Sequence, residues 1–201
     1  IINNAVLSSR SGGPMAAAYA VLNFLGEEGY KNIAKQKIEA TKKLVEGIEK
    51  HKDLKLMAKP DFCMFSFTSD TISIFHLIDK MNSIGWYIQP ALSYAHSKYN
   101  IHLSINFSNV EWVDSLLEDL YKCIEEIRDV PFGETGAALK KDFENVDPDS
   151  MSDDDIKALL QFADIGGDGF PDEMAGINEM LDAVPAKLRE KILIEYTNGI
   201  F

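Results

Sequence analysis

The sequence predicts an α/β protein whose main unit is an antiparallel sheet with helices on one face. Over residues 30–128, segments with apolar residues at helical spacing alternate with short segments that show strand-like alternation. Their order is helix, strand, strand, helix, strand, strand, helix, which joins neighbouring strands in an antiparallel or mixed sheet. The composition, 46% hydrophobic and 26% charged residues, is that of an ordinary globular protein.

The first predicted helix, residues 14–25, precedes this unit and is apolar on all sides. Pro14 suits the first helical position, and Gly26 marks the end of the helix. A helix without a polar face is normally buried, so we expect it to pack against another part of the protein. Its small-residue face, which permits close packing, comprises Ala16, Ala17 and Ala20.

Residues 30–128 hold the predicted sheet and its helices. A long surface helix is expected over residues 30–51, and further helices over 72–84 and 110–128. The predicted strands cover residues 54–57, 62–68, 86–92 and 101–107.

Beyond residue 128 the chain becomes acidic. Residues 129–201 hold 17 acidic and 6 basic side chains and carry almost all of the formal net charge of −12. Residues 129–155, rich in Gly, Pro and Asp, are predicted to form a linker. Ser152 is the expected N-cap of a helix that ends at Phe162. Two more helices are expected over residues 173–182 and 185–197.

Charge and hydropathy argue against several classes of protein. A net charge of −12 disfavours nucleic-acid binding and docking on an acidic membrane. No apolar run approaches the roughly 18 to 20 residues that a membrane span needs. The start, Ile-Ile-Asn-Asn, is neither Met nor a signal peptide, which indicates removal of an upstream part or a segment of a longer protein. Cys63 and Cys123 fit two buried thiols in a reduced compartment, so we expect a cytoplasmic location.

Residues 8–14, Ser-Ser-Arg-Ser-Gly-Gly-Pro, form a candidate anion site directly before the first helix. Hydroxyl groups, backbone amides at a helix start and an arginine suit a phosphate or a carboxylate. The structural alternative is an N-cap at Ser11 with a tight turn at Gly12 and Gly13. The segment is not a Walker loop, and no strand-borne Gly-x-Gly-x-x-Gly precedes the helix. Spacing alone leaves both interpretations open.

These residues also carry a resemblance to a known family. Ser-Ser-Arg-Ser-Gly, then Ala-Ala-Ala-Tyr-Ala-Val-Leu and Leu-Gly-Glu-Glu-Gly-Tyr, resemble the pyridoxal-phosphate-dependent group II decarboxylase family, with the sphingosine-1-phosphate lyases most similar within it. The resemblance covers about residues 5–128. It continues through Gly-Trp-Tyr-Ile at 85–88 and Ile-His-Leu-Ser at 101–104.

The resemblance implies the C-terminal portion of a fold-type I pyridoxal-phosphate enzyme. It divides the chain into the end of the large cofactor-binding domain with a linking helix (1–29), a small α+β domain (30–128) and an acidic helical tail (129–201). The implied activity is that of a carbon–carbon lyase, either a carboxy-lyase acting on an amino acid or an aldehyde-lyase acting on a phosphorylated amino alcohol. The implied assembly is a homodimer with the cofactor site near the subunit interface.

In this family the Schiff-base lysine precedes the Ser-Arg motif. The resemblance therefore implies no catalytic residue in this chain, and the segment alone is expected to be inactive. Four residues are carried over as neighbours of the cofactor phosphate, although Ser8 stands where the family usually has glycine: Ser8, Ser9, Arg10 and Gly12.

For substrate binding, the sequence offers one candidate residue and lacks one residue type that several relatives use. His96 lies in a polar loop between two predicted strands, a place from which loops often approach a site, so it is the candidate for substrate contact. Several amino-acid decarboxylases of the family hold the substrate carboxylate with an arginine on the strand at 101–107. This strand has no Arg or Lys here, which favours a phosphorylated amino alcohol.

Other titratable residues are given structural interpretations. His51 and His76 lack a partner at metal-ligand spacing. Residues 164–169 resemble the start of a calcium loop, but the twelfth position is Ala175 in place of a bidentate glutamate, so no metal site is predicted. An alternative function remains open: a non-catalytic α/β binding or regulatory module whose acidic tail is a partner surface.

Overall fold

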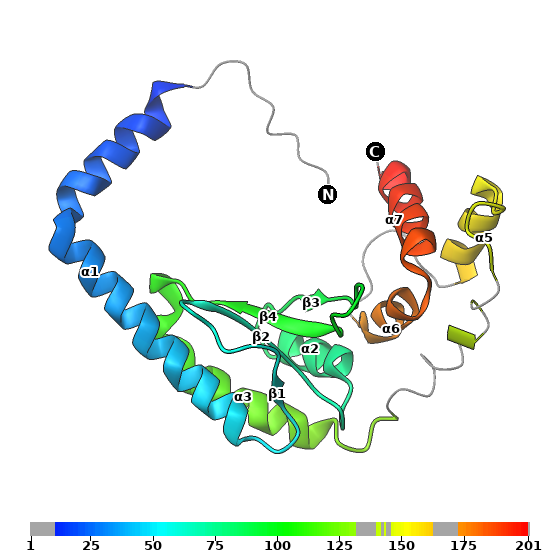
Figure 1. The fold of residues 1–201 in the computed structure, drawn as a ribbon, viewed down its shortest axis with the longest axis horizontal. Helices are drawn as coiled ribbons and strands as arrows, with labels where there is room; N and C mark the ends of the chain where they lie inside the picture. Colours follow the sequence, from blue (N-terminus) through cyan, green and yellow to red (C-terminus); the bar gives the residue numbers. More distant parts are fainter. Residues whose placement is uncertain (1–10, 132–139, 142, 144–145, 163–172, 201) are drawn as a thin grey trace.

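The computed structural model (Figure 1) describes residues 11–131, 140–141, 143, 146–162 and 173–200. Two parts are distinguished below: the body, residues 12–126, and the C-terminal group, residues 153–200. In the body, helices lie on one face of a four-stranded antiparallel sheet, so the predicted fold class is confirmed. The C-terminal group consists of α5 (Asp153–Phe162), α6 (Ala175–Ala183) and α7 (Ala186–Ile200).

Helix α1 (Gly12–Lys50) joins the two helices predicted at the N-terminal end. It bends at Gly26, whose φ of 59° and ψ of −174° lie outside the helical region, so the predicted boundary is present as a kink. Within the described residues the first half of α1 is exposed, with Tyr19 72% and Phe24 87% exposed, so its expected packing against another part of the protein stays a prediction. The buried residues of α1 begin at Ala40, in its second half.

The sheet has the strand order β1-β2-β4-β3, with every neighbouring pair antiparallel. Its strands are β1 (Lys55–Leu56), β2 (Met64–Thr68), β3 (Pro90–Ala91) and β4 (Asn100–Ser104). In the central pair, Phe65 lies opposite Leu103 and Phe67 opposite Ile101. Phe65, Phe67 and Ile101 are buried. Met64 on the other face is 60% exposed, because successive strand residues point to opposite faces.

The predicted strand over residues 86–92 is shorter in the structure. Gly85 ends α2 (Ile74–Ser83) with a positive φ of 97°, and the backbone N–H of Trp86 donates back to the carbonyl of Met81. The N–H of Ile88 donates to the side chain of Asn82. Because these donors are already used, ladder pairing begins only at Pro90.

The predicted strand over residues 101–107 also ends early. The N–H of Ile105 donates to the carbonyl of Cys63, and the 3-10 helix η1 (Phe107–Trp112) follows. Asn106 and Asn109 form a reciprocal capping box at its start, which diverts the chain from the sheet. Helix α3 (Val113–Glu126) then packs against α1 and α2.

Two hydrophobic cores are formed by the described residues. The body core lies between the sheet and its helices, and its least exposed members include Leu44, Ile48, Phe67, Ile74, Leu77, Ile78, Met81, Ile101 and Ile124. The cysteines Cys63 and Cys123 are free thiols in this core, as predicted for buried small side chains. The second core, in the C-terminal group, contains Ile156, Leu181, Val184, Leu188 and Ile192.

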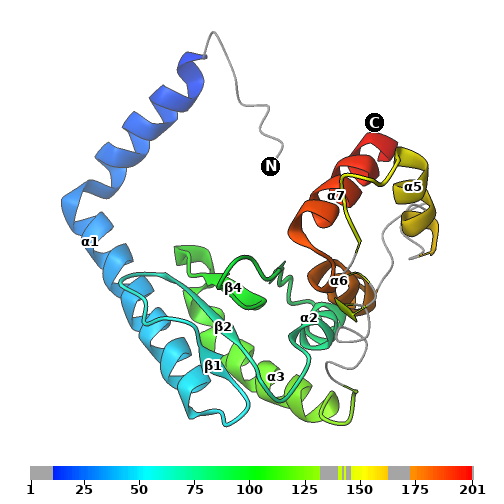
Figure 2. The ribbon, with the colours of Figure 1, turned by 45° about the vertical axis from the view of Figure 1, so that its right-hand side comes forward.

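The C-terminal group packs on the body through α6 and α2 (Figure 2). The Ser73 hydroxyl at the start of α2 donates to the Glu179 carboxylate on α6 at 2.9 Å. Ser152 precedes α5 as predicted, and its Oγ accepts a hydrogen bond from the N–H of Asp155 at 3.3 Å. None of the helices within the described ranges has the length and apolar character that crossing a bilayer requires.

Candidate functional site

The predicted anion site can be followed only in part. Ser8, Ser9 and Arg10 lie outside the described residues. Ser11 occupies the N-cap position of α1 with extended backbone angles, but its side chain makes no capping hydrogen bond. Among the described residues, a Cβ at Gly12 would have no atom within 4 Å, so none of them forms a cradle at this position. The described residues therefore do not by themselves form a site for pyridoxal phosphate.

His96 lies at the tip of a tight turn in the loop 93–97 between β3 and β4. The N–H and carbonyl of Tyr94 pair with the carbonyl and N–H of Ser97, at 3.0 and 2.9 Å. Ala95 has a positive φ of 51°, a backbone conformation that costs a residue with a Cβ about 1 kcal/mol or more. The side chain of His96 is exposed to solvent.

Two sets of contacts hold this loop. On its first leg, the Ser93 N–H donates to the Asp182 carboxylate at 2.6 Å, and the Arg189 guanidinium donates to the Ser93 carbonyl at 2.9 Å. On its second leg, the Thr68 hydroxyl donates to the Tyr99 carbonyl at 2.8 Å. The C-terminal group thus binds one leg and the sheet binds the other.

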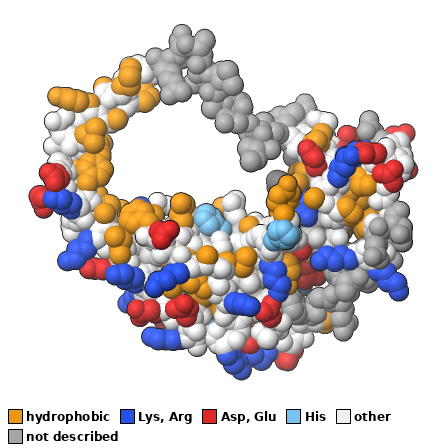
Figure 3. All heavy atoms as spheres, viewed as in Figure 1, with side chains coloured by type: hydrophobic (Ala, Val, Ile, Leu, Met, Phe, Trp, Pro, Cys, Tyr) orange, Lys and Arg blue, Asp and Glu red, His pale blue; other side chains and the backbone are white. Residues whose placement is uncertain are grey.

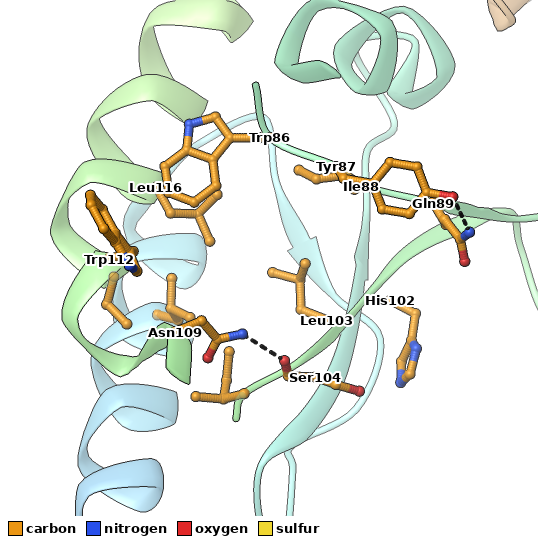
Figure 4. Close-up of a pocket in the computed structure, with 13 residues that line it drawn as sticks. Trp86, Tyr87, Ile88, Gln89, His102, Leu103, Ser104, Asn109, Trp112 and Leu116 are labelled. Atoms are coloured by element: carbon orange, nitrogen blue, oxygen red, sulfur yellow. Dashed lines mark hydrogen bonds between the residues drawn. The ribbon is translucent and has the colours of Figure 1, made fainter. Parts of the chain in front are cut away.

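A pocket of about 320 Å³ opens at the edge of the sheet between β4, η1 and the segment that follows α2 (Figure 4). In Figure 4, Trp86 and Trp112 stand on one side, Gln89 and His102 stand on the other, and Leu103 lies between. Residues 85–88 and 101–104, the two later segments of the family resemblance, both contribute lining residues. The pocket thus unites motifs that are 16 positions apart in the sequence.

Most polar groups of this pocket already have partners. The Trp86 indole N–H donates to Asp119 at 2.7 Å. The Gln89 amide donates to the Tyr87 hydroxyl at 2.7 Å, and the Asn109 amide donates to the Ser104 carbonyl. The His102 ring takes part in none of the hydrogen bonds found among the described residues, and no Lys or Arg of that set lines the pocket. The pocket therefore suits an uncharged, partly aromatic group with a hydrogen bond to His102.

Trp112, Asn109 and Gln89 were not among the residues proposed from the sequence. Trp112 and Asn109 come from η1, and Gln89 from a segment expected to be a strand. The only sequence signal near them was the aromatic pair Trp86 and Tyr87. These two residues lie outside the paired strand, and both line the pocket. His96 does not line this pocket; it lies on the separate loop beside the C-terminal group.

Comparison with known proteins relates both parts of the chain to pyridoxal-dependent enzymes. Residues 137–199 match the family model described as "Pyridoxal-dependent enzyme, C-terminal putative HTH domain". The sphingosine-1-phosphate lyase of Arabidopsis thaliana is 35% identical over 135 residues, which cover 67% of this chain and 24% of that relative. The probable L-tyrosine/L-aspartate decarboxylase of Methanosphaera stadtmanae is 31% identical over 91 residues, 45% of this chain and 23% of the relative.

Solved structures agree with the sequence matches. The sphingosine-1-phosphate lyase of Burkholderia pseudomallei superposes with a TM-score of 0.55 and 30% identity, over 61% of this chain and 27% of that chain. These matches relate the chain to the C-terminal part of sphingosine-1-phosphate lyases and group II decarboxylases. The glutamate decarboxylase of Lactobacillus brevis, with a TM-score of 0.57 and 13% identity over 64% of this chain and 31% of its own, supports the fold alone.

The chain corresponds to the C-terminal part of these relatives and spans about a quarter of their length. The fold-type I assignment made from the sequence is confirmed. Most of the acidic stretch over residues 129–201 lies in the matched segment. The family match identifies residues 137–199 as a domain type that pyridoxal-dependent enzymes carry at their C-terminal end.

Proposed function

We propose that the protein is a pyridoxal-phosphate-dependent carbon–carbon lyase, to which this chain contributes the C-terminal part. The observation that carries the proposal is the agreement of sequence and structure with one kind of relative. The match to a solved sphingosine-1-phosphate lyase combines 30% identity with a TM-score of 0.55. Pyridoxal phosphate, when bound, supplies an electron sink for the bond that breaks. The residues of this chain supply orientation and a site wall.

The proposal assigns a role to each part of the chain. Residues 1–29 form the end of the cofactor-binding domain and a linking helix, in which Ser8, Ser9, Arg10 and Gly12 lie near the cofactor phosphate. Residues 30–128 form the small domain with the pocket around His102. The exposed apolar side chains of the first half of α1, such as Tyr19 and Phe24, support packing against further parts of a homodimer.

The substrate that the chain favours is a phosphorylated amino alcohol. Strand β4 contains His102 and Ser104 but no Arg or Lys, so it lacks the cation that would hold the carboxylate of an amino acid. The match to the Arabidopsis sphingosine-1-phosphate lyase extends over 67% of the chain, against 45% for the tyrosine/aspartate decarboxylase of Methanosphaera stadtmanae. We propose a cytoplasmic location, supported by two free thiols in the body core.

The test uses the complete protein. It should bind pyridoxal phosphate with a visible absorbance band that borohydride removes, and it should release an aldehyde from a phosphorylated long-chain amino alcohol. Tyrosine, aspartate and glutamate serve as competing substrates, with carbon dioxide release as the readout. Failure to bind the cofactor would overturn the enzyme assignment. Release of carbon dioxide in place of an aldehyde would still support a carbon–carbon lyase, but it would contradict the proposed substrate.

A further inference from the structure

We propose that Asp182 and Arg189 of the C-terminal group are positioning residues for the loop 93–97, which carries His96. The role of His96 at the substrate rests on the proposed function, whereas the holding of the loop rests on contacts within this chain. The C-terminal group then acts on the site through the loop, without a catalytic residue of its own.

Asp182 binds the loop through a buried carboxylate. Asp182 is 7% exposed, and its Oδ1 accepts a hydrogen bond from the N–H of Ser93 at 2.6 Å. No ion pair found within the described ranges includes Asp182. A buried carboxylate needs hydrogen-bond donors, and a charged acceptor makes a stronger bond than a neutral one. The backbone of Ser93 therefore satisfies a group that would otherwise be costly to bury.

Arg189 binds the same residue from the other side. Its Nη1 donates to the Ser93 carbonyl at 2.9 Å, so both backbone hydrogen-bonding groups of Ser93 are held by the C-terminal group. Leu92, one residue earlier, packs against the body core and against the core of the C-terminal group. The base of the loop is thus fixed where the two cores meet.

The tip of the loop is held less closely than its base. Tyr94 and Arg189 line an open cavity of about 800 Å³ between the loop and α7, together with Leu193 and Thr197. Figure 3 shows open space between α7 and the first half of α1 in this view, and the residues that line the cavity come from the loop and α7. Because the cavity separates the turn from α7, the C-terminal group holds the turn through the hydrogen bonds to Ser93, while the bond from Thr68 to Tyr99 holds the other leg.

Hydrogen exchange measured on the complete protein tests the holding of the loop without any assay of activity. Asp182→Ala should raise amide exchange over residues 93–97 about tenfold, since a hydrogen bond to a charged group is lost. Asp182→Asn keeps the volume and one acceptor, so it should give a smaller increase in a fully folded protein. The matched control is Glu179→Ala, which removes a carboxylate of α6 that contacts Ser73 and not the loop.

Unchanged exchange over residues 93–97 in both Asp182 variants would overturn the proposal. Equal acceleration in Glu179→Ala would also overturn it, because the whole C-terminal group would then be loosening. Absence of lyase activity in the unaltered protein would contradict the proposed function. The exchange result would still show whether the C-terminal group holds the loop.

A double-mutant cycle tests the link to His96. Asp182→Ala should lower kcat/KM about tenfold when His96 is present, and should have little further effect in the His96→Ala background. A merely structural loss would lower kcat/KM by the same factor in both backgrounds and would overturn the positioning role. Arg189→Met should follow the same pattern, because it removes the donor to the other backbone group of Ser93.

Discussion

The carboxylate of Asp79, on α2, accepts a hydrogen bond from the backbone N–H of Ala175 at 2.7 Å, at the point where α6 begins. The same oxygen accepts the N–H of Met174 at 2.8 Å. Met174, the N-cap residue, makes no side-chain capping bond of its own. A side chain from the body therefore satisfies the free N–H groups of a helix in the C-terminal group, and it also places a negative charge at the positive end of that helix.

Asp79→Ala should destabilise the attachment of the C-terminal group. We expect a loss of about 1 to 2 kcal/mol in the free energy of unfolding, the usual cost of removing a helix cap. Urea unfolding followed by circular dichroism measures it. Asp154→Ala is the matched control, because Asp154 is an exposed acid in the first turn of α5. Equal losses in the two variants would contradict a specific role of Asp79 as a cap.

The pH dependence of stability should differ between the protein and Asp79→Asn. Burial raises the pKa of Asp79 and outweighs the backbone donors of α6, which favour the charged form. A carboxyl with a raised folded-state pKa contributes stability that is present below about pH 3.9, its unfolded value, and is lost as pH rises through the folded value. The stability of the protein relative to Asp79→Asn should fall between pH 4 and pH 7, as measured by urea midpoints. A rise over this range would contradict the raised pKa.

Asp53 should show the opposite pH dependence. Burial opposes its charge, but hydrogen bonds from Thr71 at 2.8 Å and Arg128 at 3.1 Å outweigh burial and hold the pKa of Asp53 below its usual range. Its contribution is therefore present above about pH 3.9 and is lost as pH falls through the folded value. Asp53→Asn should lower the free energy of unfolding at pH 7 by about 1 to 2 kcal/mol, and by less at pH 3. Asp61→Asn, at an exposed position, is the control and should change little at either pH.

The helices and the central strands were predictable because their signals are local. Apolar spacing located α2 and α3, and residue alternation located β2 and β4. The strand expected over residues 86–92 failed for a tertiary reason, since Asn82 and Met81 accept the backbone N–H groups of Ile88 and Trp86. Alternation alone does not reveal such a competitor.

The candidate site was predictable only as separate segments. The resemblance singled out residues 85–88 and 101–104, yet their meeting in one pocket depends on the strand order and on η1. The contact between Ser93 and Asp182 joins positions 89 residues apart and involves a backbone group, so no side-chain pattern could signal it. His96 was located in a loop from its polar neighbours, but what holds that loop came from the structure.

Arg10 should affect retention of the cofactor in the complete enzyme. The resemblance puts it near the cofactor phosphate, where a charge-assisted hydrogen bond is worth about a 10- to 100-fold change in affinity. Arg10→Ala should raise the dissociation constant of pyridoxal phosphate by that factor, measured by dialysis and absorbance, with unchanged circular dichroism. Lys42→Ala removes an exposed cation on α1 and should leave the constant unchanged. Equal affinity in both variants would return Arg10 to a structural role.

Gly85→Ala should destabilise the protein through its backbone alone. Gly85 closes α2 with a φ of 97°, and a Cβ at this position would have no atom within 4 Å, so the cost comes from the left-handed conformation and not from a clash. We expect a loss of about 1 to 2 kcal/mol in the free energy of unfolding, measured in urea.

Gly176 is the matched control: it also has open space for a Cβ but lies inside α6. Gly176→Ala should raise stability by up to about 1 kcal/mol, because alanine is the better helix former. If Gly85→Ala were as stable as Gly176→Ala, the positive φ would not be a requirement of the turn that leads into the pocket at Trp86.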